Sequence, residues 1–131
     1  YVNPCTKNYI YKNSNLISIH TPLTKKTKNL ISKLELKQMS NDCLIVNTSR
    51  GNIINEKDLY AHLIKNKNFQ AALDVFHEEP YNGNLLTCKN ILLTSHMGSM
   101  SIDCRSKMEL EATTDAIRFI NNKKLYNLVK L

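Results

Sequence analysis

Residues 43–51 have the sequence CLIVNTSRG, and they contain the clearest strand signal of the chain. The apolar run Cys43–Val46 is rich in branched side chains, which is typical of a strand covered on both faces of a parallel sheet. Similar short apolar runs predict further strands at Leu16–Ile19, Ala71–Phe76 and Ile91–Leu93. Each run is short and ends in polar or turn-forming residues, which favours a strand over a helix.

Helical patterns lie between and after these strands. A capping-box pattern of Ser32 and Glu35 predicts a short helix that continues through Met39. An asparagine cap at position 55 predicts a helix that ends near residue 66. A serine at position 101 predicts a long helix to about Ile120, with apolar side chains at helical spacing.

Strands that alternate with helices predict an α/β fold with a parallel, Rossmann-like sheet. The order of elements suits only the second mononucleotide half of such a sheet, followed by a long C-terminal helix. The chain has three glycines, Gly51, Gly83 and Gly98, and it contains no G-x-G-x-x-G turn for a pyrophosphate. It also begins with Tyr1 rather than methionine. We therefore expect that a first half, with that turn, belongs in front of this sequence.

Composition argues against several classes of function. The net charge is +7, but only three of the 18 basic residues are arginines and the lysines are scattered, so no nucleic-acid partner is expected. The four cysteines are far apart, which argues against a zinc or Cys-x-x-Cys redox site and favours reduced thiols in the cytoplasm. No apolar stretch is long enough to span a bilayer, so no membrane partner is expected.

Polar residues follow the carboxyl end of each predicted strand, where open parallel sheets bind their ligands. Three of these segments supply an arginine, a glutamate and a histidine as candidates for the site: Arg50, Glu79 and His96. The segments themselves are His20-Thr21-Pro22, Thr48 to Gly51, Asp74 to Pro80, and Ser95 to Gly98. The pattern predicts that these side chains gather at one edge of the sheet.

Four motifs in this order and spacing resemble the D-isomer-specific 2-hydroxyacid dehydrogenases, most of all the phosphoglycerate dehydrogenase branch. They are His20-Thr21-Pro22-Leu23-Thr24, Asn47-Thr48-Ser49-Arg50-Gly51, Asp74-Val75-Phe76-x-x-Glu79-Pro80 and His96-x-Gly98. The resemblance runs from about Asn13 to Asn122. It implies that residues 1–121 are the C-terminal part of an NAD-binding domain, and that residues 122–131 return to a substrate domain that is not in the sequence.

The resemblance also implies roles for individual residues. His96 matches the general acid and base, Glu79 the carboxylate that hydrogen-bonds and stabilises its imidazolium, and Arg50 the arginine that grips a substrate carboxylate. Asp74 matches the residue that orients the nicotinamide ring. The cofactor-contacting positions of the family correspond to Thr21, Thr48, Ser49, Arg50, Asp74, His96, Gly98 and Ser99.

Structural alternatives exist for each of these residues. His96 could bond only backbone, Glu79 could be a solvated acid before a proline, and Arg50 could stabilise a surface turn. Asp74 could cap the turn after its strand. Of the other titratable side chains, His20 is expected to satisfy a buried backbone group, and His62 and His77 are expected in solvent. Cys43 is expected in the core, and residues 25–28 in solvent.

The resemblance implies an NAD-dependent oxidoreductase that interconverts a D-2-hydroxy acid, phosphoglycerate-like, and its 2-keto acid. D-lactate, glycerate and hydroxypyruvate remain alternatives, because the missing domain largely sets the substrate. A homodimer is expected for the full-length protein, and the chain alone is expected to be inactive. Two non-enzymatic alternatives share the fold: an NAD-binding corepressor and an inactive truncated remnant.

Overall fold

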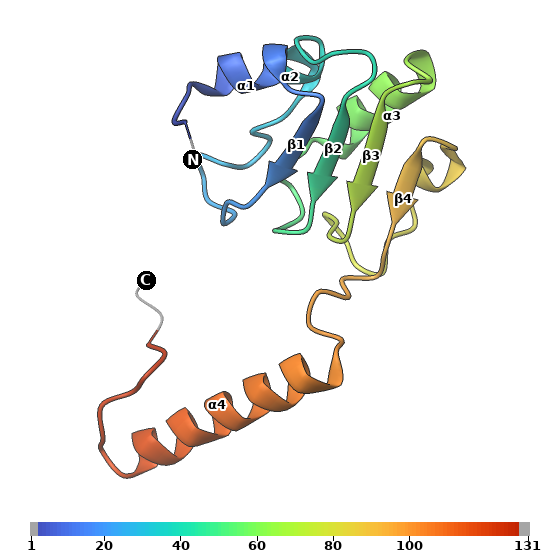
Figure 1. Cartoon of the computed structure of the whole chain (residues 1–131). Coiled ribbons are helices and arrows are strands. Elements are labelled where there is room, and N and C mark those ends of the chain that lie inside the picture. The colour runs from blue at the N-terminus through green and yellow to red at the C-terminus, as the bar shows by residue number, and fades with distance from the viewer. Residues whose placement is uncertain (1–2, 129–131) are drawn as a thin grey trace. The chain divides into compact units, whose positions relative to one another are not determined.

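The computed structural model describes residues 3–128, and it separates into two compact units, Tyr1–His96 and Met97–Leu131. The first unit contains a four-stranded sheet in the order β1-β2-β3-β4 (Figure 1). Its strands are β1 (Leu16–Ile19), β2 (Leu44–Asn47), β3 (Gln70–Leu73) and β4 (Ile91–Leu93). All neighbouring strands are parallel, so the predicted Rossmann-like half-sheet is confirmed.

One face of this sheet carries the core of the first unit. Ile45 of β2 is fully buried, and so are Leu59 and Leu63 of helix α3 (Glu56–Lys65). Helices α1 (Lys7–Asn13) and α2 (Lys33–Leu36) contribute the buried side chains Tyr11 and Leu36. These apolar contacts fix the sheet against its helices, and so they fix the ends of the strands at which the candidate site lies.

The other face of the sheet is less covered than the sequence predicts. Burial alternates along β1, β2 and β3, so that only every second side chain is fully buried. On the open face, Leu16 is 59% exposed and Leu92 is 64% exposed. Within the first unit, the prediction of a sheet covered on both faces is met on one face only. Both faces of the strands carry apolar side chains, as is typical of a parallel sheet with a covering layer on each face.

The predicted helix starts agree with the structure. The side chain of Asn55 accepts a hydrogen bond from the N–H of Asp58 at 3.1 Å, and the capping box of Ser32 and Glu35 is present. Helix α2 ends at Leu36 rather than Met39, because the chain continues in tighter turns. Strand β3 ends at Leu73, three residues before the end of the apolar run. Helix α1 and the short 3₁₀ helix η1 (Asn84–Thr87) were not predicted.

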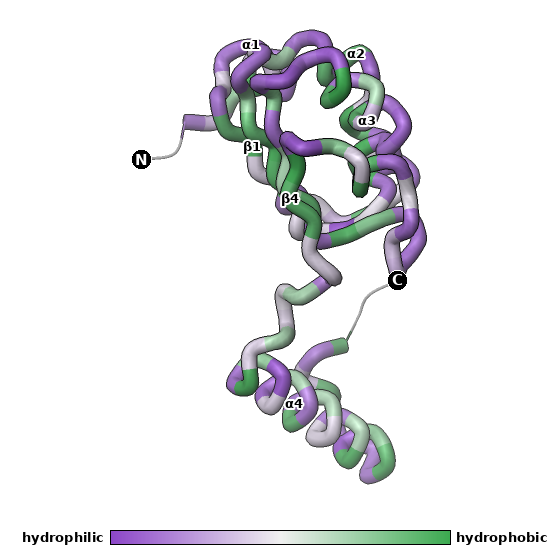
Figure 2. The backbone as a smooth tube through the Cα atoms, turned by 90° about the vertical axis from the view of Figure 1, so that its right-hand side faces the viewer, coloured by the Kyte–Doolittle hydropathy of each residue, from purple (hydrophilic) through white to green (hydrophobic). Residues whose placement is uncertain are grey.

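The second unit is built around helix α4 (Ile102–Ile120), which has no buried residue. Figure 2 shows hydrophobic and hydrophilic residues interleaved along it. The segment after α4 returns to its last turns: Asp115 accepts hydrogen bonds from the N–H groups of Tyr126 and Asn127, and Arg118 stacks on the Tyr126 ring at 3.9 Å. The boundary at residue 121 and the role of the tail stay predictions, and Val129 lies outside the described residues.

The open edge of β1 makes a prediction about the isolated chain. Leu16 is exposed on a strand whose described pairing partner is β2 alone, and such edges pair with other chains. We expect the 131-residue chain to self-associate, and Leu16→Lys to raise the monomer fraction in light scattering. Leu34→Lys, at an exposed position of α2, is the matched control away from the sheet edge. A monodisperse wild-type monomer would contradict this expectation.

Candidate active site

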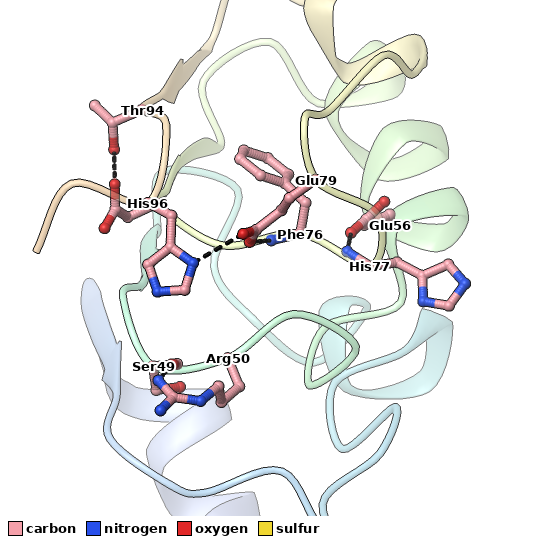
Figure 3. A network of polar contacts seen from close by, with 9 residues as sticks. Ser49, Arg50, Glu56, Phe76, His77, Glu79, Thr94 and His96 are labelled. Atoms are coloured by element: carbon pink, nitrogen blue, oxygen red, sulfur yellow. Dashed lines mark hydrogen bonds and ion pairs between the residues drawn. The ribbon is translucent and has the colours of Figure 1, made fainter.

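The carboxyl ends of three strands bring the candidate catalytic side chains to one region of the first unit. Arg50 follows β2, Glu79 lies in the loop after β3, and His96 follows β4. Figure 3 shows these side chains on neighbouring loops, with His96 turned toward Glu79. The structure therefore gathers residues from segments that are distant in the sequence.

Asn47 organises the loop that carries Arg50. It ends β2, is only 2% exposed, and accepts hydrogen bonds from both the N–H and the hydroxyl of Ser49, at 3.1 and 2.8 Å. Its side-chain amide donates to the carbonyl oxygen of Arg50 at 2.9 Å. All three bonds close the turn around residue 49. This role of Asn47 was not predicted, although a polar residue at the end of an apolar strand is a signal of such a turn.

Gly51 sets how closely the Arg50 loop approaches the loop after β3. A Cβ atom at this position would overlap the carbonyl oxygen of Phe76. The φ angle of Gly51 is not positive, so the requirement for glycine here is one of space rather than of backbone conformation. The two loops therefore touch through their backbones.

Arg50 has an exposed side chain whose Nη1 donates to the carbonyl oxygen of Ser49 at 2.6 Å. This bond is the turn-stabilising contact that the structural alternative expects. It uses one of the five N–H donors of a guanidinium, so the group can still form a two-pronged contact with a carboxylate. Both interpretations of Arg50 are compatible with this geometry.

Glu79 and His96 form the central pair of the site. The Oε2 atom of Glu79 lies 2.8 Å from Nδ1 of His96, and its Oε1 accepts a hydrogen bond from the N–H of Phe76 at 3.0 Å. The bond to His96 and then the bond to Phe76 hold the pKa of Glu79 below its ordinary value. Glu79 is therefore a carboxylate at neutral pH, and it is not simply a solvated acid.

His96 has a left-handed backbone, with φ of 54°. This conformation is uncommon for a side chain with a Cβ atom and costs on the order of 1–3 kcal/mol. Such residues cluster at functional sites because the surrounding structure must hold them in place. The strained backbone and the bond to Glu79 together argue that the orientation of this ring is specified.

Asp74 continues from β3 and is 7% exposed. Its Oδ1 accepts a hydrogen bond from the hydroxyl of Thr94 at 2.5 Å, and its N–H donates to the carbonyl oxygen of Asn47. A buried carboxylate requires such partners. Asp74 thus ties the ends of β2, β3 and β4 together, next to the predicted catalytic pair.

The remaining predicted cofactor positions fall into both units. Thr48 is exposed and Ser49 is partly buried in the Arg50 loop, whereas Gly98 and Ser99 belong to the second unit. Thr21 follows β1, and its hydroxyl is buried without a hydrogen-bond partner among the described residues. An ordered water, an ion or a bound ligand can satisfy such an atom. Thr21 and the Arg50 loop, which both belong to the first unit, therefore fit the edge of a cofactor site.

An open pocket of about 500 Å³ adjoins the Glu79–His96 pair. Its walls combine apolar side chains from the loop after β3 and from β4 with the polar groups of Glu79 and His96. The other lining residues are Phe76, Pro80, Tyr81, Leu86, Leu93, Thr94 and Ser95. The pair is thus accessible, which the exposed fractions of 48% for the His96 side chain and 38% for Glu79 also show.

The predictions for two other histidines, His20 and His62, are wrong. His20 is exposed and its Nε2 lies 2.7 Å from the hydroxyl of Ser18, so it does not satisfy a buried backbone group. His62 packs edge-on against Phe69 at 4.6 Å, and burial lowers its pKa, so it is not in free solvent. The predictions that Cys43 is buried and that His77 is exposed are confirmed.

The described residues contain no cluster of three or more side chains suited to hold a metal ion. All four cysteines are free thiols. No helix among residues 3–128 combines the length and the apolar character needed to cross a membrane.

Comparison with known proteins gives a consistent result. Residues 1–98 match the family described as D-isomer specific 2-hydroxyacid dehydrogenase, NAD binding domain. The glyoxylate reductase of Aeropyrum pernix is 38% identical over 122 residues, which cover 92% of this chain and 36% of that protein. The D-3-phosphoglycerate dehydrogenase of Methanocaldococcus jannaschii is 43% identical over 93 residues, which cover 70% of this chain and 18% of that protein.

A solved structure supports the same relationship. The chain is similar to the holo form of D-mandelate dehydrogenase from Rhodotorula graminis, with a TM-score of 0.86 and 30% sequence identity. The match covers 96% of this chain and 37% of the solved one. The match to an NAD binding domain confirms the prediction that NAD is the cofactor. The chain spans only 36% of the length of the Aeropyrum relative.

The lowered pKa of Glu79 predicts a pH-dependent contribution to stability. A carboxyl group whose pKa is lower in the folded state stabilises the fold above its ordinary pKa, and the effect is lost as the pH falls through the lowered value. We expect Glu79→Gln to lower the melting temperature near neutral pH and to have little effect at strongly acidic pH. The change is expected to be small because Glu79 is partly exposed. Glu78→Gln is the control, and a difference independent of pH would contradict the assignment.

Proposed function

The chain belongs to the D-isomer specific 2-hydroxyacid dehydrogenases, and from this premise we propose that it forms the catalytic part of an enzyme that interconverts a 2-keto acid and a D-2-hydroxy acid. The contact of 2.8 Å between Glu79 and His96 carries this proposal. It pairs a group that can transfer a proton with an anion that stabilises its charged form, and such a pair is suited to protonate the oxygen of a carbonyl group as that group is reduced.

The proposed mechanism divides the work among three side chains. NAD, in its reduced form, supplies the hydride for the keto carbon. His96 donates a proton to the carbonyl oxygen, and because its Nδ1 is bonded to Glu79, its Nε2 is the atom that faces the substrate. Glu79 fixes the ring and stabilises the imidazolium. Arg50 grips the carboxylate and polarises the neighbouring carbonyl group.

The substrate class is inferred from this chemistry and from the relatives. A guanidinium beside a histidine suits a carboxylate next to a carbonyl group, as in a 2-keto acid. The relatives include a glyoxylate reductase, a hydroxypyruvate reductase and a D-3-phosphoglycerate dehydrogenase. We propose a small substrate of this class, with the phosphoglycerate-like acid as the first candidate, and a homodimer as the working assembly.

The proposed activity is tested on the full-length protein that contains this chain. Glyoxylate, hydroxypyruvate and 3-phosphohydroxypyruvate are offered with NADH, and NADH oxidation is followed by absorbance. We expect at least one of these acids to be reduced. Stoichiometric NADH binding without turnover of any 2-keto acid would reject the enzymatic proposal and favour a non-enzymatic NAD-binding role.

Replacement of Arg50 tests the grip on the substrate carboxylate. Arg50→Lys keeps the positive charge but loses the two-pronged geometry, so we expect kcat/KM to fall by at least roughly tenfold. The affinity for NADH is expected to change little. Lys57→Arg, at an exposed position in α3, is a control for a basic-residue exchange elsewhere in the first unit. An unchanged kcat/KM in Arg50→Lys would remove Arg50 from the substrate site.

A double-mutant comparison tests whether His96 and Glu79 act as one unit. His96→Ala and Glu79→Ala are each expected to lower kcat, and the double variant is expected to lose less than the product of the two losses. Steady-state kinetics of all three variants provide the measurement. Fully multiplicative losses would show that the two side chains act independently.

A further inference from the structure

Glu56 joins the two loops of the site, although it lies outside the predicted catalytic set. It is the first residue of α3, and its Oε1 accepts a hydrogen bond from the backbone N–H of His77 at 2.7 Å (Figure 3). The two residues are 21 positions apart in the sequence. The bond therefore connects the helix that follows the Arg50 loop to the loop that carries Glu79.

The bond acts on the part of that loop that positions the catalytic carboxylate. His77 directly follows Phe76, whose N–H donates to Oε1 of Glu79 at 3.0 Å. Two successive backbone N–H groups are thus held by two carboxylates, one from within the loop and one from α3. Any shift of the backbone at His77 would also move the N–H group that holds Glu79 against His96.

The position of Glu56, the helix side of this hydrogen bond, is also fixed by neighbouring contacts. Asn55 caps α3 by accepting from the N–H of Asp58 at 3.1 Å, so Glu56 is held at a defined helix start. Upstream, Gly51 places the Arg50 loop against the backbone of Phe76. Glu56 and Gly51 therefore approach the same short loop from the same connection between β2 and α3.

Packing contributes little at this junction. Glu56 and His77 line two open pockets, of about 470 Å³ and about 320 Å³. Tyr81 contributes to the wall of the first pocket and Asn29 to the wall of the second. A hydrogen bond flanked by open space is not reinforced by dense side-chain contacts. Its loss is thus expected to free the loop locally without emptying the core.

From these contacts we propose that Glu56 is a positioning residue that holds the Glu79 loop in register with the Arg50 loop. This inference rests on the proposed function, because it assigns Glu56 to the same catalytic pair. A purely structural alternative is that Glu56 only stabilises the N-terminus of α3, where an acidic side chain is favourable. The two roles differ in what happens at Glu79 when Glu56 is replaced.

Three variants of the full-length protein separate these roles. Glu56→Ala removes the acceptor, Glu56→Gln keeps a side-chain oxygen that can accept from His77, and Glu56→Asp keeps the charge on a shorter side chain. Glu78→Ala is the matched control, because it removes an exposed carboxylate from the same loop. The measurements are kcat and KM for the 2-keto acid, the melting temperature, and the titration of the Glu79 carboxyl by ¹³C NMR.

We expect Glu56→Ala to lower kcat by roughly tenfold with a smaller change in KM, because a charge-assisted bond that orders the loop is lost. The pKa of Glu79 is expected to rise as the Phe76 N–H moves away, since that bond helps to keep it low. Glu56→Gln is expected to recover most of both properties, and Glu56→Asp to resemble Glu56→Ala. Glu78→Ala is expected to leave both properties unchanged.

Opposite results would overturn the proposal. A lowered melting temperature in Glu56→Ala with unchanged kcat and unchanged Glu79 titration would leave only the helix-end role. Should Glu56→Ala fail to fold, the titration of Glu79 in Glu56→Asp decides in its place, and a wild-type value there rejects the proposal. If the wild-type protein reduces no 2-keto acid, the proposed function fails, while the Glu79 titration still tests the link from Glu56.

Discussion

The close approach of Gly51 to the carbonyl group of Phe76 is the constraint on which the candidate site depends. Because there is no room for a Cβ atom, the loop after β2 and the loop after β3 meet backbone to backbone. Arg50 directly precedes this contact, and Glu79 lies three residues beyond Phe76 in the chain. A larger separation would move the loop that carries Arg50 away from the loop that carries Glu79.

Around this contact, backbone N–H groups are held mainly by side-chain oxygens. Asn47 closes the Arg50 turn, Glu79 accepts from Phe76, and Glu56 accepts from His77. Such bonds specify geometry in loops, where no ladder of strand or helix bonds is available. They also explain how an exposed site can keep His96 in a left-handed conformation: its partner, Glu79, is itself fixed from the backbone side.

The first unit exposes apolar side chains and leaves one buried hydroxyl group without a hydrogen-bond partner among the described residues. One face of its sheet and the free edge of β1 expose apolar side chains, and the hydroxyl of Thr21 is buried without a partner among the described residues. Leu16 and Thr21 lie on β1 or directly after it, whereas Leu92 exposes the same face of the sheet on β4. The Glu79–His96 pair, by contrast, is complete within the first unit. The first unit therefore contains both members of this pair, although it leaves apolar surface and a buried hydroxyl group without partners among the described residues.

The sequence by itself determined the strands, the helix caps and the family, because apolar runs, capping residues and motif spacing are local patterns. The apolar run correctly indicates that Val75 and Phe76 are buried. It does not show that the strand ends before them, because they lie in the loop after β3. Only the tertiary structure decided which group each carboxylate holds. Glu79 meets His96 across 17 positions and Glu56 meets His77 across 21, and such pairings depend on the paths of separate loops, which no local pattern records.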